Sequence, residues 1–336
     1  RGALGGKQRR LPLLHMKAIS YVTAQTAESA VELVRAQGRF LAGGMDLLGE
    51  MKEGLVEPAV LVNVKALPGL REVVTTRDQV AIGAGVTLTT VAGHPDIRLL
   101  FPGLAQAAEA VGSPQMRNVG TVGGNLAQHS RCWYYRQRDV RCVKKGGPRC
   151  FARGGENKYH SLFTQNMCLS PCVSNLAVVL AALDAAVVVQ RGAQRVTLSL
   201  AQLYEKAWTE AKAHHSLAAA DLMLRIEVPV IAGARSVYLK LAEKNEFDWA
   251  LVSCAAAGRV EEGKYRGVRI ALGSVAPIPW LVREANAFLE GKPATAETAQ
   301  GAAEILLRDA EPREQNGYKI PLAKVLVKRA LAALVA

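Results

Sequence analysis

Cysteine is the residue type in this 336-residue chain with the clearest capacity for chemistry, because five of its six copies fall within 41 residues. The five are Cys132, Cys142, Cys150, Cys168 and Cys172. Such thiols can pair as disulfides, bind structural zinc, hold an iron–sulfur cluster or pack without a metal. Only Cys168 and Cys172 have the short spacing that zinc knuckles prefer, and no export signal favours disulfides. Iron–sulfur clusters accept ligands from irregular loops, so the spacing alone leaves the chemistry open.

The cysteine-rich stretch is also basic and aromatic, as "RCWYYRQRDVRCVKKGGPRC" (131–150) shows. Nine Lys or Arg residues stand between positions 131 and 158, against Asp139 and Glu156, in a chain whose formal net charge is +13. A basic total describes partners rather than fold. No nucleic-acid-binding motif is present and aromatic residues make up only 5%, so we do not expect nucleic acid as a partner. We expect a contact surface for a partner subunit, or compensation of a buried anionic cofactor.

Two glycine pairs form a second group of candidate binding residues. "LAGGMDLL" (41–48) and "TVGGNLA" (121–127) each follow a β-type run. Paired glycines let the backbone approach a ligand closely, and successive free N–H groups can bind an anion such as phosphate. Each pair alone also fits an ordinary tight turn. Neither fits G-x-G-x-x-G, so a Rossmann dinucleotide site is not supported, and the absence of G-x-x-x-x-G-K-[ST] excludes a P-loop.

Histidine and hydrolase-type signals are weaker. His214 and His215 have no ligand partner at metal spacing and are expected to be solvated. His129 and His160 flank the cysteine-rich stretch and are expected mainly at the surface, within reach of a cofactor. The sequence contains no G-x-S-x-G, no H-E-x-x-H and no paired carboxylates that would indicate hydrolysis.

The elements that must position these residues alternate between strands and helices. A strand, a turn and a helix are expected over 21–38, with Thr26 as N-cap and Gly38 as the stop. A hairpin is expected about Arg77-Asp78, and an apolar helix should pass into a strand over 175–190. Beyond about residue 206 the pattern indicates a separate α+β module, in which Cys254 is a core residue. No run of eighteen apolar residues occurs, so no membrane span is expected.

Four separated segments, taken in order, carry a family resemblance. They are "LAGGMDLL" with "MKEG", "NVGTVGGNLA", "LAVVLAALDAAVVV" and "SVYLKLAEKNEFDWALVSCAA". Together they resemble the FAD-binding (medium) subunit of the molybdenum hydroxylases, the family of carbon monoxide dehydrogenase, bacterial xanthine dehydrogenase and 4-hydroxybenzoyl-CoA reductase. The resemblance implies an α+β fold, with a two-subdomain FAD-binding part and a C-terminal domain of antiparallel sheet and helices. The expected ranges are 1–15 for a disordered arm or added residues, 16–205 for the FAD-binding part (subdomains about 16–70 and 71–205, cysteine-rich insert 128–172) and 225–336 for the C-terminal domain.

The resemblance also implies which residues contact FAD. In the family, both glycine segments hold the FAD pyrophosphate through backbone N–H groups. A family Ser-Asp pair that touches FAD reads Ser174-Asn175 here, and asparagine offers hydrogen bonds without charge. Lys240 matches a family lysine near the flavin ring, and Asp248 matches a family acidic position. The implied FAD-binding residues are Leu41, Ala42, Gly43, Gly44, Met45, Asp46, Leu47, Thr121, Gly123, Gly124, Asn125, Ser174, Asn175 and Lys240.

The insert is similar to the loop of the 4-hydroxybenzoyl-CoA reductase branch, which binds a [4Fe–4S] cluster. Cys132, Cys142 and Cys150 fit that pattern as metal ligands. Where the branch has its fourth cysteine before a histidine, this chain reads Tyr159-His160. We therefore expect Cys168 as the fourth ligand, with Cys172 as the alternate.

The family's enzyme joins this chain to a large molybdopterin-binding subunit and a small [2Fe–2S] subunit. The chain would pass electrons between iron–sulfur clusters, FAD and an external carrier (NAD, ferredoxin or quinone), in the cytoplasm. Substrate chemistry would lie on a partner subunit, so no catalytic side chain is expected here. The alternative is a stand-alone FAD- or metal-binding accessory protein without turnover of its own.

Overall fold

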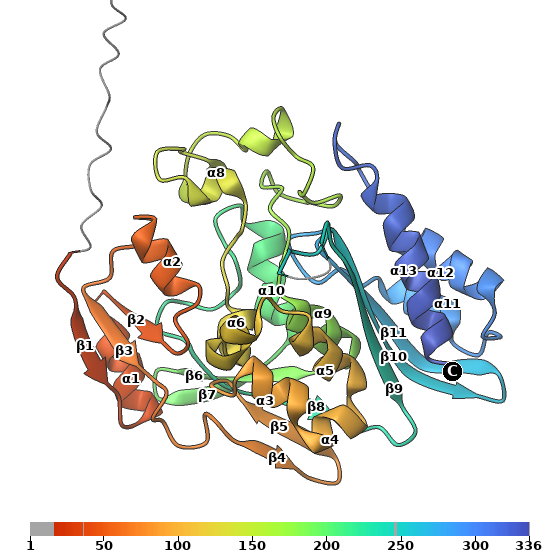
Figure 1. The fold of residues 1–336 in the computed structure, drawn as a ribbon, viewed down its shortest axis with the longest axis horizontal. Helices are drawn as coiled ribbons and strands as arrows, with labels where there is room; N and C mark the ends of the chain where they lie inside the picture. The colour runs from red at the N-terminus through yellow and green to blue at the C-terminus, as the bar shows by residue number, and fades with distance from the viewer. Residues whose placement is uncertain (1–16, 36, 245–246, 336) are drawn as a thin grey trace, which may run out of the picture.

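A computed structural model describes residues 17–35, 37–244 and 247–335, so the expected arm at 1–15 lies outside the described residues. The strands form three sheets, of orders β1-β3-β2, β4-β5-β8-β6-β7 and β11-β10-β9, with helices packed around them (Figure 1). The expected mixture of helices and sheets is confirmed. The strands are β1 (Ser20–Thr23), β2 (Gly38–Leu41), β3 (Val60–Asn63), β4 (Val73–Thr75), β5 (Gln79–Gly83), β6 (Ala186–Arg191), β7 (Gln194–Ser199), β8 (Leu222–Pro229), β9 (Arg235–Leu241), β10 (Val252–Glu261) and β11 (Lys264–Gly273).

Most of the described helices are short, and only α10, α12 and α13 reach ten residues. Among the described residues, no helix has both the length and the apolar character needed to cross a membrane. The helices are α1 (Ala27–Arg35), α2 (Leu47–Lys52), α3 (Leu88–Gly93), α4 (Pro95–Leu100), α5 (Pro102–Glu109), α6 (Pro114–Val119), α7 (Val122–Leu126), α8 (Trp133–Arg136), α9 (Asn175–Ala182), α10 (Leu200–Thr209), α11 (Arg283–Leu289), α12 (Ala296–Leu307) and α13 (Lys319–Ala333), with 3₁₀ turns at Val143–Lys145 and Phe151–Arg153.

The first sheet is parallel and is covered by α1. Thr26 caps this helix as expected, because its Oγ1 accepts a hydrogen bond from the Ser29 N–H at 3.1 Å. The helix ends at Arg35, and the left-handed residue after it is Gln37 (φ 65°) rather than the expected Gly38. Gly38 instead opens β2, where a Cβ would lie 2.9 Å from the Val34 Cα. A close approach of two elements, not a helix stop, therefore requires this glycine.

The second sheet is antiparallel and includes the expected hairpin. Strands β4 and β5 pair across the turn that contains Arg77 and Asp78. Strand β8 lies in the middle of the sheet, paired with β5 on one side and β6 on the other. The sheet therefore extends past residue 205, where the FAD-binding part was expected to end. It also includes residue 225, at which the C-terminal domain was expected to begin. Pairing between strands more than 100 residues apart carries no local sequence signal.

Helix α9 and the third sheet connect the two parts of the molecule. All eight residues of α9 are buried, and the helix contacts β10 and β11 as well as α5, α7 and α10. Strand β10 alternates between two cores: Cys254 and Ala256 face the helices α11–α13, whereas Ala255 and Ala257 face the core that contains α9. Cys254 is fully buried, which confirms its expected place in the core.

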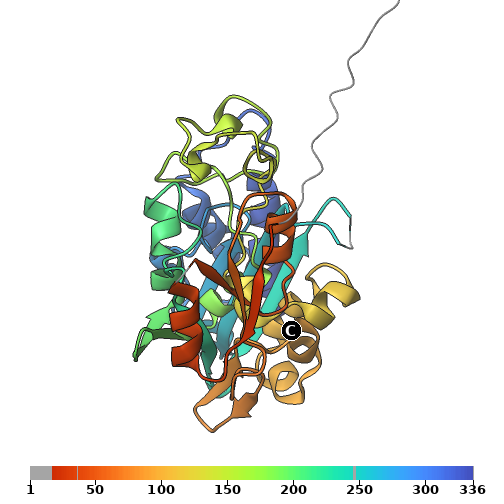
Figure 2. The same ribbon diagram turned by 90° about the vertical axis from the view of Figure 1, so that its left-hand side faces the viewer.

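The insert, residues 128–172, joins α7 to α9 with little regular structure beyond α8. In Figure 1 it lies above the sheets, between α2 and α13, and Figure 2 shows it at the same end of the molecule from the side. A loop of this length needs specific contacts to offset its ordering entropy.

A buried amide provides one of these contacts. The Asn316 Nδ2 group donates hydrogen bonds to the carbonyl oxygens of His160 and Ser161, at 3.2 and 3.1 Å. The Asn316 Oδ1 atom accepts from the Arg313 N–H at 2.6 Å, and the side chain is fully buried. Because both ends of the amide are satisfied, Asn316 fixes the backbone of the insert against the C-terminal part.

A buried lysine provides another contact. The Lys319 Nζ donates to the carbonyl oxygens of Tyr159 and Ser274, at 3.0 and 2.8 Å, and the side chain is fully buried. Burial lowers the pKa of Lys319 to about 7. The unfolded chain holds this proton up to about pH 10.5. The free energy of unfolding should therefore rise with pH from about 7 to about 10.5, and the lysine penalises folding fully below pH 7.

Lys319→Met should remove this pH dependence. Between pH 7 and pH 10, wild type should gain up to about 1.4 kcal/mol per pH unit relative to the variant, the limit for one proton. Urea unfolding at several pH values measures the difference. Arg329→Met, an exposed change on the same helix, should keep the wild-type slope. Equal slopes for Lys319→Met and wild type would contradict the assignment.

Candidate functional site

Both glycine segments line one cavity of about 490 Å³. This volume lies in the range of cofactor and ligand sites. The walls also include residues that sequence reasoning did not select, among them Glu50, His129, Arg131, His215 and Trp249. The expected site residues in the walls are Leu41, Ala42, Gly43, Gly44, Met45, Asp46, Leu47, Thr121, Gly123, Gly124 and Asn125.

The first glycine segment connects β2 to α2 and presents its backbone to the cavity. Gly44 has a left-handed conformation (φ +72°), and a Cβ on Gly43 would collide with the carbonyl group of Val119. Among the described residues, no acceptor pairs with the backbone N–H groups of 42–46. These residues are partly exposed, and Met45 is exposed, so their N–H groups are open to a ligand in the cavity. This row of donors can therefore bind an anion.

The second glycine segment differs from the expected turn, because it forms the short helix α7. Thr121 caps this helix, accepting a hydrogen bond from the Gly124 N–H at 3.2 Å. The Gly123 N–H donates to the Ala84 carbonyl and the Asn125 N–H to the Thr121 carbonyl, both at 2.8 Å. These three N–H groups are therefore already used within the protein. The segment therefore offers no row of free donors. It can instead let a ligand approach the backbone closely, since Gly124 is exposed to the cavity.

Three expected site residues do not line the cavity. The Ser174 Oγ caps α9 and donates to the Asn125 Oδ1 at 2.6 Å, so it positions a wall residue from behind. The Asn175 Nδ2 donates to the Ala107 carbonyl at 3.4 Å and is buried. The Lys240 Nζ donates to the carbonyl of Ala110, the residue before wall residue Val111, and burial lowers its pKa. The structure thus places these side chains next to the wall rather than in it.

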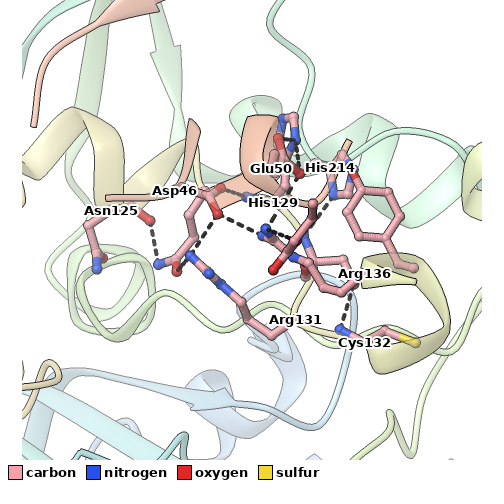
Figure 3. Close-up of polar contacts among 12 residues, drawn as sticks. Asp46, Glu50, Asn125, His129, Arg131, Cys132, Arg136 and His214 are labelled. Atoms are coloured by element: carbon pink, nitrogen blue, oxygen red, sulfur yellow. Dashed lines mark hydrogen bonds and ion pairs between the residues drawn. The ribbon is translucent and has the colours of Figure 1, made fainter. Parts of the chain in front are cut away.

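A partly buried ion-pair network joins the first glycine segment to the insert (Figure 3). The Asp46 carboxylate pairs with Arg131 at 2.8 Å and Arg136 at 2.6 Å, and it accepts from the His129 N–H at 2.7 Å. Burial acts to raise the pKa of Asp46, but Arg131, the His129 N–H and Arg136 together hold it below its usual value. Asp46 therefore remains ionised and keeps both arginines in place at neutral pH.

Glu50 extends the network one helical turn along α2. Its side chain is 2% exposed, and it accepts a hydrogen bond from the Tyr135 hydroxyl at 2.8 Å. The His129 Nδ1 lies 3.0 Å from the carboxylate, and Arg136 lies at 3.8 Å. Asp46, Glu50 and His129 are the one group of possible metal donors within 4.8 Å of one another in the described residues. Because two guanidinium groups already balance its charge, this group is an ion-pair network and not a cation site.

The two adjacent histidines are partly buried rather than solvated as expected. His214 stacks on His129 with ring centres 4.1 Å apart, and its Nδ1 accepts from the Ser130 N–H at 3.2 Å. Burial, followed by the charge of His129, lowers the pKa of His214 well below its usual value. Burial lowers the pKa of His215, a wall residue, to about 4. Their surroundings come from chain segments 80 residues away, which no local pattern reveals.

Four of the five cysteines in the insert lie around one buried ammonium group. Lys144 is 9% exposed, and its Nζ donates to the Ala213 carbonyl at 2.7 Å. Burial lowers the pKa of Lys144, and the negative charge of four nearby cysteines, when ionised as thiolates, acts to raise it. No carboxylate in the described residues pairs with this lysine. The four are Cys132, Cys142, Cys150 and Cys168.

Cys172 lies apart from these four. It packs against the main core, beside Tyr204 and Tyr238. Burial raises its pKa to about 11, opposed only by the Ser174 N–H. All six cysteines, including Cys254, are free thiols, so the structure contains no pairing of the kind expected for a disulfide framework.

The "KGG" stretch brings two of the four cysteines together. Cys142 and Arg149 form an isolated bridge, which places Cys150 beside Cys142. The Gly147 N–H donates to the Cys142 carbonyl at 2.9 Å, and Gly146 has a left-handed conformation (φ +82°). A Cβ on Gly147 would collide with a neighbouring carbonyl group. Glycine at both positions is therefore needed for a turn this tight.

Two family models match the chain, and together they span almost all the described residues. The model for the FAD binding domain in molybdopterin dehydrogenase matches residues 17–231, and that for the CO dehydrogenase flavoprotein C-terminal domain matches 237–334. The aldehyde oxidoreductase FAD-binding subunit PaoB of Escherichia coli (strain K12) is 32% identical over 328 residues, which cover 96% of this chain and 98% of the relative. The carbon monoxide dehydrogenase medium chain of Hydrogenophaga pseudoflava is 28% identical, over 93% and 96% of the two chains.

Solved structures support the same conclusion. Carbon monoxide dehydrogenase from Hydrogenophaga pseudoflava superposes with a TM-score of 0.76 at 27% identity, over 96% of this chain and 98% of that chain. Quinoline 2-oxidoreductase from Pseudomonas putida 86, at 24% identity and a TM-score of 0.73, supports the fold alone. The expected two-part fold, FAD as cofactor and the role of an oxidoreductase subunit are confirmed. The chain belongs to the family of FAD-binding medium subunits of the molybdenum hydroxylases and carbon monoxide dehydrogenases.

Proposed function

We propose that this chain is the electron-transfer subunit of a molybdenum-containing hydroxylase or dehydrogenase, and that FAD lies in the cavity between the two glycine segments. The observation that carries the proposal is the row of N–H groups at 42–46, which have no acceptor among the described residues and belong to a segment that lines that cavity. These donors suit the FAD pyrophosphate, and Gly124 lets the cofactor approach the backbone of α7. FAD supplies the exchange between two-electron and one-electron transfer. The FAD-binding part then runs through β8, and the C-terminal domain begins at β9.

The chain's own residues bind, orient and shield the cofactor. Asn125 lines the cavity, with its Oδ1 held by Ser174, so its amide N–H groups are left for the ligand. Lys240 stands behind the wall at Ala110, where its charge can act on the flavin without direct contact. Asn175 is hydrogen-bonded to the Ala107 carbonyl, outside the cavity wall, and we assign it no contact with FAD. No side chain of this chain is required as a general base.

We further propose that the insert holds a [4Fe–4S] cluster. Lys144 is a buried cation with a carbonyl partner and no carboxylate, which fits compensation of an anionic group among four thiolates. Sulfur ligands of one zinc ion would lie about 3.8 Å apart, given the Zn–S distance and tetrahedral geometry. In the described residues, no three cysteine sulfurs lie within 4.8 Å of one another, so the group lacks the spacing of a zinc site. Cys168 belongs to the group and Cys172 does not, which favours Cys168 as the fourth ligand.

The partners follow from the family. Carbon monoxide dehydrogenase medium chains belong to multi-subunit enzymes, and we assign this chain a large molybdopterin-binding subunit and a small [2Fe–2S] subunit as partners. The match over nearly the whole chain favours this role over a stand-alone accessory protein. Electrons would leave to NAD, a ferredoxin or a quinone. Exposed Arg141, Arg149 and Arg153 on the insert suit contact with a partner, and six free thiols suit the cytoplasm.

Gly124→Val should weaken FAD binding by roughly tenfold or more, which corresponds to at least about 1.4 kcal/mol. The added side chain points toward the cavity and meets only the Thr121 hydroxyl, so the fold should persist. Gly44→Val adds backbone strain at a positive φ and is the less selective change. Gly93→Val is the matched control, since nothing lies within 4 Å of its added Cβ. Flavin absorbance per chain and titration of flavin-depleted protein measure the effect, and full flavin content in the folded Gly124 variant would refute the placement.

Serine substitutions should separate the cluster ligands from the other cysteines. Cys132→Ser, Cys142→Ser, Cys150→Ser and Cys168→Ser should each lower iron and acid-labile sulfide from about four of each per chain, while FAD stays bound. Cys172→Ser and Cys254→Ser should leave both contents unchanged. One zinc per chain, or no metal in anaerobically purified wild type, would exclude the cluster. Loss of iron from Cys172→Ser and not from Cys168→Ser would show that Cys172, rather than Cys168, is the fourth ligand.

A further inference from the structure

One histidine contacts the proposed cluster site from outside the group of cysteines. The His160 Nε2 lies 3.2 Å from the Cys132 Sγ, within hydrogen-bond distance of a sulfur acceptor. The residue is 2% exposed, which departs from the surface position expected from the sequence. Because water is excluded from this position, the Cys132 sulfur is the hydrogen-bond partner available to the His160 Nε2 atom.

The insert holds the His160 ring in this position. The His160 N–H donates to the Asn157 carbonyl at 2.9 Å, and its carbonyl accepts from Asn316 at 3.2 Å. Trp133 packs edge-on against the ring with centres 5.6 Å apart, and Tyr134 lies at 6.3 Å. Backbone and ring are therefore fixed, and the contact with sulfur needs no rearrangement when the site is filled.

The second ring nitrogen identifies which atom carries the proton. The His160 Nδ1 is buried and has no hydrogen-bond partner in the described part of the chain. A proton on Nδ1 would be a buried donor without an acceptor, which costs about 1–3 kcal/mol. A proton on Nε2 points at the Cys132 sulfur, and a ligated thiolate can only accept. The favoured arrangement is therefore Nε2–H donating to Sγ.

We propose that His160 is a positioning residue that tunes the insert's iron–sulfur cluster through this hydrogen bond to Cys132. A donor to a ligand sulfur withdraws electron density and stabilises the more negative, reduced state of the cluster, so it raises the reduction potential. The inference rests on the proposed cluster. It adds a residue outside the four cysteines that sets how readily the cluster accepts an electron.

His160→Phe, which keeps an aromatic ring and removes the donor, tests the proposal. With iron and sulfide per chain unchanged, its midpoint potential in an anaerobic titration monitored by electron paramagnetic resonance should be lower than that of wild type. His160→Gln, which can place an amide N–H near the Nε2 position, should restore part of the shift. Tyr134→Phe is the control, since it changes a neighbouring ring without removing a donor to sulfur, and its potential should equal that of wild type. Equal potentials for His160→Phe and wild type would overturn the proposal.

A measurement on wild type covers the case in which His160→Phe loses its iron. In protein carrying ¹⁵N-labelled histidine, pulsed paramagnetic resonance of the reduced cluster should show a weak coupling to one histidine nitrogen. Absence of this coupling would overturn the hydrogen bond even though the cluster is present. Wild type without iron and sulfide would instead refute the cluster itself, and the tuning role with it.

Discussion

The pairing of Asp46 with Arg131 and Arg136 is the interaction on which the site depends. Asp46 lies within the first glycine segment, and Glu50 lies one helical turn beyond it with 2% exposure. Carboxylates buried this way are costly unless cations and hydrogen bonds compensate them. The compensating arginines belong to the insert, more than 80 residues later in the chain. The cofactor segment and the cysteine-rich insert therefore stabilise each other.

Chain connectivity strengthens this dependence. Asn125 lines the cavity at α7, Arg131 lines it again, and Cys132 is the next residue. Cys132 is the seventh residue after Asn125, a span of at most about 25 Å even when fully extended. Lys144 adds a second link, because it lies near the cysteines and its Nζ also donates to Ala213, in the loop that carries His214 and His215. A structural change at the cysteines can therefore affect the walls of the cavity in two ways: along the chain from Cys132 to Arg131, and through Lys144 to the loop of His214 and His215.

Local patterns predicted the features that short stretches determine. Thr26 as a cap, the hairpin about Arg77-Asp78 and the buried Cys254 follow from turn chemistry and strand alternation. The grouping of the four cysteines with Lys144, the central place of β8 and the stacking of His214 on His129 depend on segments far apart in sequence. The second glycine segment was expected as a turn because Gly-Gly disfavours helix, yet the Thr121 cap and the Ala84 carbonyl hold it in one. Tertiary contacts override propensity at that point.

Amide hydrogen exchange in flavin-depleted and FAD-reconstituted protein tests the central claim most directly. The N–H groups of residues 42–46 have no acceptor in the described part of the chain, whereas those of 123–125 are already hydrogen-bonded. Adding FAD should therefore slow exchange strongly at 42–46 and much less at 123–125. If FAD binds and exchange at 42–46 stays unchanged, the first glycine segment does not hold the cofactor, and the account of the site fails.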